Sequence, residues 1–276
     1  MKIMADSSAL YTLEEGKQLG VSIIPVCVAI NDENYKDYLD ITPEHFLDLI
    51  AQGGVPTSSQ PAIGDVLELF EDTSEDILYL TVGDGLSGTY QNAVGIKNTL
   101  ENNEHIHIVN CKSLAGVNHY LVEKAALLRD KGMRVQEILQ ELHHSIESSV
   151  SFVIPADFDF LKRSGRLTPV AAKIGSLIKI VPVMTQTEDK MRITPFAIKR
   201  STKTALDAIF SHLKKLGVNE NFVVSISHAG VAEQARKVCE QVRNEFPGTL
   251  VEMFHLSASL ITHGGPGSIV VQAVRK

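Results

Sequence analysis

The segment ILYLTVGDGLSGTY, residues 77–90, joins a short apolar run to a glycine-rich loop and decides the fold that the sequence predicts. Its first part, 77–82, is an unbroken run of aliphatic, aromatic and β-branched residues. Such a run predicts a strand, and its place between amphipathic stretches is typical of α/β proteins with parallel sheets. The loop that follows, 83–88, should open a helix. Strand, loop and helix in this order form the repeating unit of α/β proteins.

The same alternation of short β-branched runs and amphipathic stretches extends over most of the chain. Strands are predicted at 2–5, 21–30, 106–110, 150–154, 180–184, 191–198, 222–227 and 250–256, and helices at 203–216 and 231–246. Threonine–proline pairs at 42–43 and 168–169 predict further helix starts, and residues 31–34 predict a hairpin turn. A chain of 276 residues that is 44% hydrophobic can bury two cores. We therefore predict an α/β fold of two domains, 1–149 and 150–276, with largely parallel sheets.

Composition excludes several classes of function. A formal net charge of −7 and a sequence pI near 5.8 argue against nucleic acid as a partner, because nucleic-acid-binding proteins are usually basic. We expect a cytoplasmic protein without stable membrane insertion, because the sequence contains neither a signal-peptide pattern nor an apolar run of membrane-spanning length. No metal is expected either. The three cysteines are far apart, and the pairs His105/His107 and His143/His144 lack suitably spaced partner ligands.

A first candidate anion site is the loop Pro56-Thr57-Ser58-Ser59-Gln60-Pro61, which precedes the periodic apolar run at 63–70. If this loop opens a helix, its backbone N–H groups and its hydroxyls would face an anion together with the positive end of the helix dipole. The alternative is ordinary capping of that helix by Ser58 or Ser59. The loop alone does not decide between them.

The second candidate is the loop at 83–88, where Ser87 and Gly88 offer a hydroxyl and backbone N–H groups at the carboxyl end of a strand. The loop also spells G-x-G-x-x-G, the dinucleotide-binding pattern. A dinucleotide fits poorly because Asp84 would lie beside the pyrophosphate and the next strand ends in Asn110 and Cys111 instead of an acid. A nucleophilic Ser87 is also disfavoured, since the G-x-S-x-G elbow is absent. An anion held by Ser87 and Gly88 remains.

The third candidate is the loop 262–268, THGGPGS, whose glycines and proline fix an unusual backbone path. His263 in this loop can donate a hydrogen bond to a carboxylate; a surface histidine in a tight turn is the alternative. Basic residues gather at 162–166 and 199–203. Solvated surface is the usual role of such runs.

Five motifs in this order and spacing resemble the DegV family. They are Asp6-Ser7, Ser58-Ser59-Gln60-Pro61, Gly85-Leu86-Ser87-Gly88-Thr89-Tyr90-Gln91, Leu161-Lys162-Arg163-Ser164-Gly165-Arg166-Leu167 and His263-Gly264-Gly265-Pro266-Gly267. The resemblance covers nearly the whole chain. It implies a two-domain α/β protein that binds one long-chain fatty acid such as palmitate, with the head group between the domains and the tail in the C-terminal one. It implies no cofactor and no catalysis by this chain.

Some members of that family carry lipid for a fatty acid kinase, so the resemblance also implies a separate ATP-using kinase subunit as partner. The residues that it implies for the fatty-acid carboxylate are Ser58, Ser87, Gly88 and His263, and Arg166 and Arg200 are implied for contact with the partner or the phosphoryl group. Ser58 replaces the family's usual threonine. The sequence departs from the family pattern at two places. The family often has a lysine before the proline where this chain has Ile180-Val181-Pro182, and the residues after the last glycine are Ser268-Ile269-Val270-Val271. Both departures leave the preferred length of the acyl chain and the affinity for the partner open.

The sequence leaves one alternative function and the lining of the tunnel open. The alternative function is a serine hydrolase or acyltransferase that uses Ser87 and His263. The tunnel walls cannot be told from ordinary core; the residues considered for them are Phe152, Ile174, Leu177, Ile178, Phe196, Leu256, Leu260 and Ile261.

Overall fold

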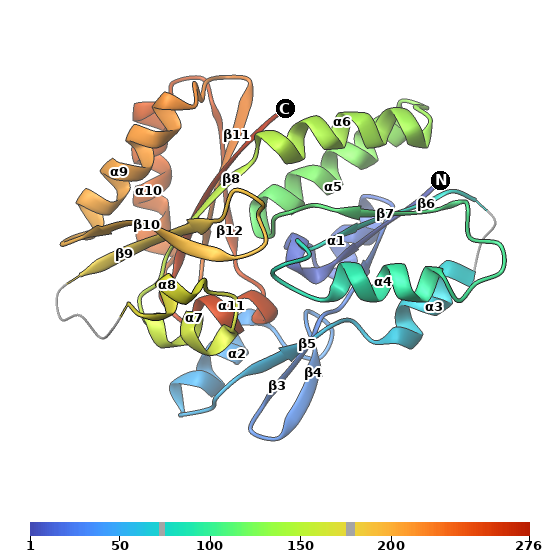
Figure 1. Ribbon diagram of the computed structural model, residues 1–276, viewed down its shortest axis with the longest axis horizontal. Helices are drawn as coiled ribbons and strands as arrows, with labels where there is room; N and C mark the ends of the chain where they lie inside the picture. Colours follow the sequence, from blue (N-terminus) through green and yellow to red (C-terminus); the bar gives the residue numbers. More distant parts are fainter. Residues whose placement is uncertain (72–74, 175–179) are drawn as a thin grey trace. The chain divides into compact units, whose positions relative to one another are not determined.

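The computed structural model describes residues 1–71, 75–174 and 180–276 (Figure 1). These residues form two compact units. The first unit is Met1–Glu147 with Ser257–Ser259, and the second is Ser148–Leu256 with Leu260–Lys276. The short return of Ser257–Ser259 to the first unit is not foreseen by the sequence analysis.

The first unit is built on a parallel sheet of order β2-β1-β6-β7. Its strands are β1 (Lys2–Asp6), β2 (Val21–Ile24), β6 (Ile77–Thr81) and β7 (Ile106–Asn110). Every residue of β6 is buried, which accounts for its unbroken apolar run. The parallel sheet predicted from residues 77–90 is therefore confirmed.

Helices cover both faces of this sheet. The helical elements of the first unit are a short 3-10 helix η1 (Ser7–Ala9), α1 (Leu13–Gln18), α2 (Pro43–Ala51), α3 (Ile63–Glu71), α4 (Thr89–Lys97), α5 (Ala115–Asp130) and α6 (Val135–Ser148), of which α3, α4 and α5 pack on or beside the sheet. Phe70 of α3 and Ile96 of α4 pack with Tyr79 in one buried cluster, and α5 lies on the opposite side (Figure 1). Thr42 caps α2 with Pro43 at its first turn, as predicted.

A small antiparallel sheet of order β4-β3-β5 completes the first unit. It consists of β3 (Cys27–Ile30), β4 (Glu33–Lys36) and β5 (Thr57–Ser59). The single strand predicted at 21–30 is wrong, because the chain passes from β2 in one sheet to β3 in another at Pro25, which has no N–H for a ladder. The predicted hairpin is present: Asn31 and Asp32 form its turn, with φ of 54° and 63°.

The second unit contains one sheet of order β10-β9-β8-β13-β11-β12. Its strands are β8 (Val150–Ile154), β9 (Val181–Gln186), β10 (Ile193–Lys199), β11 (Phe222–His228), β12 (Leu250–His255) and β13 (Ile269–Arg275). The α/β class is confirmed, but the expectation of a largely parallel sheet needs correction here. Only β11 and β12 pair in parallel among these strands.

Two features explain this antiparallel pairing. A tight turn joins β9 to β10, with the Thr187 N–H donating to the Arg192 carbonyl at 2.8 Å. The C-terminal strand β13 lies between β8 and β11 and runs antiparallel to both. The sequence analysis did not predict β13, although the run Ile269-Val270-Val271 is β-branched.

The core of the second unit lies mainly between its sheet and two helices. The helices of the unit are α7 (Phe158–Ser164), α8 (Pro169–Ala172), α9 (Thr202–Lys215), α10 (Ala232–Glu245) and α11 (Ala258–Gly264), the last of which begins in residues of the first unit. Phe152 and Val183 pack with α9 and α10 on one face (Figure 1). Met184, which points to the other face, packs with Leu161 of α7 and Ala171 of α8.

Candidate functional site

The carboxyl edge of the parallel sheet has the arrangement in which α/β proteins bind ligands. From neighbouring strands β1 and β6 the chain proceeds outward in opposite directions, to β2 and to β7, so that their ends form a topological switch point. Asp6 ends β1, and its Oδ2 accepts a hydrogen bond of 2.7 Å from the N–H of Val82. This bond ties the end of β1 to the start of the loop that contains Ser87.

That loop is held by its own backbone and by its neighbour. The N–H groups of Leu86 and Ser87 both donate to the Gly83 carbonyl, at 3.0 and 3.1 Å, and the Gly83 N–H donates to the Ser113 carbonyl at 2.7 Å. A Cβ at position 83 would lie 2.9 Å from the Ser113 nitrogen, so only glycine fits. The loop is thereby pressed against the segment that follows β7.

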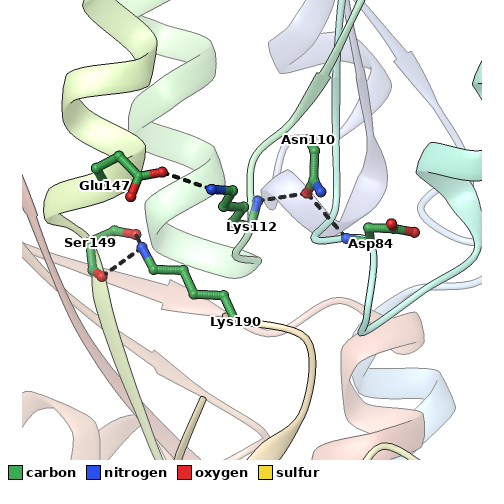
Figure 2. A network of polar contacts seen from close by, with 6 residues as sticks. All are labelled: Asp84, Asn110, Lys112, Glu147, Ser149 and Lys190. Carbon is green, nitrogen blue, oxygen red and sulfur yellow. Dashed lines mark hydrogen bonds and ion pairs between the residues drawn. The ribbon is translucent and has the colours of Figure 1, made fainter. Parts of the chain in front are cut away.

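Asn110 adds a second tie between these two segments (Figure 2). Its Oδ1 accepts from the N–H groups of Asp84, at 3.2 Å, and Lys112, at 2.9 Å. The Lys112 ammonium in turn pairs with Glu147 at 2.8 Å. Asn110 at the end of β7 therefore shapes the glycine-rich loop, a role that its place in the sequence does not reveal.

Ser87 lies at the entrance of α4, half-buried. Its Oγ is 2.9 Å from Thr89 Oγ1 and accepts a hydrogen bond of 3.3 Å from the Thr89 N–H. Gly88 at the cap position contributes no side chain to the helix start. The positive end of the α4 dipole and a hydroxyl, which can both donate and accept, thus occur together at this point.

Ser58 lies in a different secondary structure from the one predicted. The segment 57–59 is strand β5, paired with β3, and α3 begins only at Ile63, so the expected helix start at these hydroxyls is wrong. Ser58 is half-buried in this strand. A Cβ on Gly88 would lie 2.1 Å from Gln60 Nε2, so the segment after β5 meets the Ser87–Gly88 loop. The structure thus brings two of the three predicted loops together in the first unit.

His263 and Arg166 belong to the second unit and influence each other there. His263 is in the last turn of α11, where the prediction had a loop, because the helix continues from Ala258 to Gly264. An unusual backbone path was expected after it, and Gly265 and Gly267 are left-handed there, with φ of 78° and 77°. Burial, and second the charge of Arg166, lower the pKa of His263 to about 4. His263 is therefore neutral at pH 7.

The two predicted arginines differ in their surroundings. Arg166 follows Gly165, the left-handed residue that ends α7; its N–H donates to Ser164 Oγ at 3.1 Å and its guanidinium to the Ser164 carbonyl. Burial lowers the pKa of Arg166. Arg200 is exposed in the turn after β10. Only Arg166 is thus linked to His263 by an electrostatic interaction described in the structure.

Two buried carboxylates in the first unit were missed as a pair by the sequence analysis. Asp6 and Asp37 are 1% and 0% exposed. Burial raises the pKa of each, and hydrogen bonds from serine hydroxyls and backbone N–H groups oppose the rise. Asp6 was noted only as part of a motif. No local pattern marks Asp37, because three of its hydrogen-bond partners lie at 257–259.

The residues considered for the tunnel walls do not form one group in the structure. Leu177 and Ile178 lie outside the described residues, whereas Phe152 and Phe196 pack in the main core of the second unit. In the part of the chain that the structure describes, no three His, Cys, Asp or Glu side chains are grouped to hold a metal ion. Among the same residues, no helix combines the length and apolarity that crossing a membrane requires.

Comparison with known proteins places this architecture. The sequence model of the DegV family matches residues 1–276. The protein DegV of Bacillus subtilis is 25% identical over 272 residues, covering 97% of this chain and 96% of that protein. A DegV-domain-containing protein of Halalkalibacterium halodurans is 27% identical over 277 residues, covering 97% of this chain and 95% of that protein.

Solved structures share the fold over the full chain. A fatty-acid-binding DegV-family protein of Thermus thermophilus superimposes with a TM-score of 0.90 at 23% identity, covering 100% of this chain and 99% of that one. A DegV-family protein of Ruminococcus gnavus with vaccenic acid gives a TM-score of 0.88 at 24% identity, covering 98% of each chain. The fold thus defines a two-unit α/β protein of a class that includes fatty-acid-binding proteins. The chain belongs to the DegV family.

The lowered pKa of His263 predicts a specific pH dependence of stability. An unfolded histidine titrates near pH 6.5, whereas the folded value is about 4. The unfolded state therefore binds the extra proton, and the contribution of His263 to the free energy of unfolding falls as the pH drops from 6.5 to 4 and then stays constant. We expect wild type to lose on the order of 1 to 2 kcal/mol more than His263→Gln between pH 7 and pH 5, measured by urea unfolding. Equal losses in both proteins would contradict this titration.

Proposed function

We propose that this chain binds a long-chain fatty acid and holds its carboxylate at Ser58, Ser87, Gly88 and His263. The observation that carries the proposal is the half-buried Ser87 hydroxyl beside the start of α4, at the switch point of the parallel sheet. The family supports it, since relatives of this fold hold vaccenic or heptadecanoic acid. The acyl tail is assigned to the C-terminal unit.

The energetics favour a ligand with a long apolar tail. Burying about fourteen methylenes at roughly 0.8 kcal/mol each contributes on the order of 11 kcal/mol, which dominates the affinity. The head group then sets the orientation, because an unpaired carboxylate in an apolar site costs several kcal/mol. Hydroxyls, backbone N–H groups and a neutral imidazole N–H can together donate to the lone pairs of that carboxylate.

The proposed role is that of a carrier. The carboxylate would be presented to a separate ATP-using fatty acid kinase subunit, which forms the acyl-phosphate, in the cytoplasm and without a cofactor held by this chain. Arg166 and Arg200 are assigned to contact with that subunit or with the phosphoryl group. Arg166 is half-buried and interacts electrostatically with His263, which suits a position at the site. Arg200 is exposed, which suits a position on a docking face.

The alternative is a serine hydrolase or acyltransferase in which His263 activates Ser87. That mechanism needs the imidazole within hydrogen-bond reach of Ser87 Oγ. The contacts described for this oxygen are with Thr89. The pKa of His263, lowered to about 4, makes the imidazole a weak general base at pH 7 and favours binding over nucleophilic catalysis.

The deciding experiment is extraction of the purified protein with organic solvent, followed by mass spectrometry of the extract, beside p-nitrophenyl ester turnover. We expect about one fatty acid per chain and no turnover above background. A preparation without lipid that also fails to take up palmitate would refute the carrier proposal. Strong turnover that is lost in His263→Gln would establish the hydrolase instead.

The substitution Ser87→Ala tests the head-group assignment. It removes one hydroxyl and leaves the Gly88 backbone and the tail site, so palmitate should still bind but more weakly, by roughly 1.5 to 3 kcal/mol for one charge-assisted hydrogen bond. Titration calorimetry measures the change. Ser211→Ala serves as the control, because the hydrogen bond described for that hydroxyl is to the Asp207 carbonyl within its own helix. Unchanged affinity in Ser87→Ala would place the carboxylate elsewhere.

The two arginines should separate lipid binding from phosphorylation. In Arg166→Ala and Arg200→Ala we expect acyl-phosphate formation by the kinase subunit to fall much more than palmitate affinity. Burial of the acyl tail supplies most of the binding free energy, and neither arginine is assigned to the tail site. The exposed Arg134, in the first unit, provides a matched loss of charge. Equal losses of turnover and lipid affinity would move the arginines into the head-group site.

A further inference from the structure

The first N–H groups of α11, the helix that contains His263, donate to a side chain from a distant part of the sequence. The N–H of Ala258 donates to Asp37 Oδ1 at 3.1 Å, and the N–H of Ser259 donates to Asp37 Oδ2 at 3.3 Å. The first N–H groups of any helix need acceptors, and a carboxylate at this end also complements the helix dipole. Asp37 therefore caps α11 across 221 sequence positions.

The Asp37 carboxylate is itself fixed from several sides. Ser7 Oγ donates to its Oδ2 at 3.0 Å and accepts from the Val26 N–H at 3.0 Å. The Asp37 N–H donates to the Val26 carbonyl at 2.9 Å. With 0% exposure, the carboxylate is shielded from bulk solvent, so the loss of any of these bonds would be costly. The cap is thus attached to the segments that follow β1 and β2 in the first unit.

A helix as short as α11 depends on such a cap. It has seven residues, well below the length at which an isolated helix is stable in water. Its span is only about 10 Å, so a shift at the first turn reaches the last turn almost undiminished. His263 lies five positions after Ala258, in that last turn.

We propose that Asp37 is a positioning residue that sets the direction in which His263 presents its N–H, by fixing the first turn of α11. The inference rests on the proposed function, in which His263 donates to the carboxylate of a fatty acid. Asp37 does not touch the ligand. It acts on head-group recognition through the backbone of α11 and leaves tail burial unaffected.

A purely structural role predicts a different result. Loss of stability alone would weaken every ligand of the second unit to a similar extent. Loss of His263 positioning weakens a ligand with a carboxylate much more than one with a neutral hydroxyl, because hydrogen bonds to a charged group are stronger. Palmitate and hexadecanol share the same tail and differ at the head, so their comparison separates the two roles.

The test measures both ligands by displacement of a fluorescent fatty acid analogue from wild type, Asp37→Asn, His263→Gln and the double variant. Asp37→Asn keeps the shape of the side chain but loses the charge and one acceptor. We expect palmitate affinity to fall about threefold to tenfold, the scale of one helix cap, and hexadecanol affinity to fall much less. In the His263→Gln background the second substitution should add less than about twofold, since the two act as a unit.

Thr12→Ala is the matched control. Thr12 caps α1, with its Oγ1 accepting from the Glu15 N–H at 3.2 Å, and should change neither affinity. Equal losses for both ligands in Asp37→Asn, or full additivity with His263→Gln, would overturn the inference. Should Asp37→Asn fail to fold, Ser7→Ala decides, because it removes the Ser7 Oγ bond that holds Asp37 Oδ2: a loss selective for palmitate supports positioning, and an equal loss or none refutes it.

The same measurements separate the two levels of proposal. If wild type binds palmitate no more tightly than hexadecanol and His263→Gln changes nothing, the proposed head-group site has failed. If those two proteins behave as proposed and Asp37→Asn matches Thr12→Ala, only the positioning role of Asp37 has failed.

Discussion

The buried carboxylate of Asp6 is the interaction on which the arrangement of the site depends. A carboxylate with 1% exposure needs a donor for each oxygen, and the chain supplies the N–H groups of Val82 and Ser8, at 2.7 and 3.0 Å. Because Val82 directly follows β6, this requirement fixes where the loop to Ser87 begins. Ser7, the next residue, holds Asp37. One pair of adjacent residues at the end of β1 therefore organises both the glycine-rich loop and the start of α11.

The elements that were predictable from sequence are those whose stability is local. The strand at 77–81 is buried on both faces and reads as an unbroken apolar run, and Thr42-Pro43 marks a helix start by its own hydrogen bond. The elements that were missed depend on distant partners. Strand β5 is a polar three-residue segment defined only by its pairing with β3, and α11 is capped from position 37. Neither leaves a periodic pattern in its own residues.

The candidate site divides in the same way. Ser87 and Gly88 were found because a glycine-rich loop after a buried strand is a local signal, and the structure joins them to the Ser58 segment through Gln60 and Gly88. Asn110 and Asp37, which shape that loop and cap α11, were not identified. Their roles consist of accepting backbone N–H groups from other segments. Such acceptors become visible only when tertiary structure shows which donors would otherwise be buried without a partner.

The pKa of His263 bears on the choice between a carrier and a hydrolase. A general base works best when its pKa lies near the working pH, and a histidine of pKa about 4 accepts a proton from a serine poorly at pH 7. The same shift leaves the imidazole neutral, with one N–H to donate, which is what a bound carboxylate requires. The charge of Arg166, the second cause of the shift, also disfavours the protonated imidazole. It therefore both weakens His263 as a base and keeps it neutral. The electrostatics of the second unit thus oppose proton abstraction while leaving the imidazole neutral, and this combination suits holding a carboxylate better than attacking an ester.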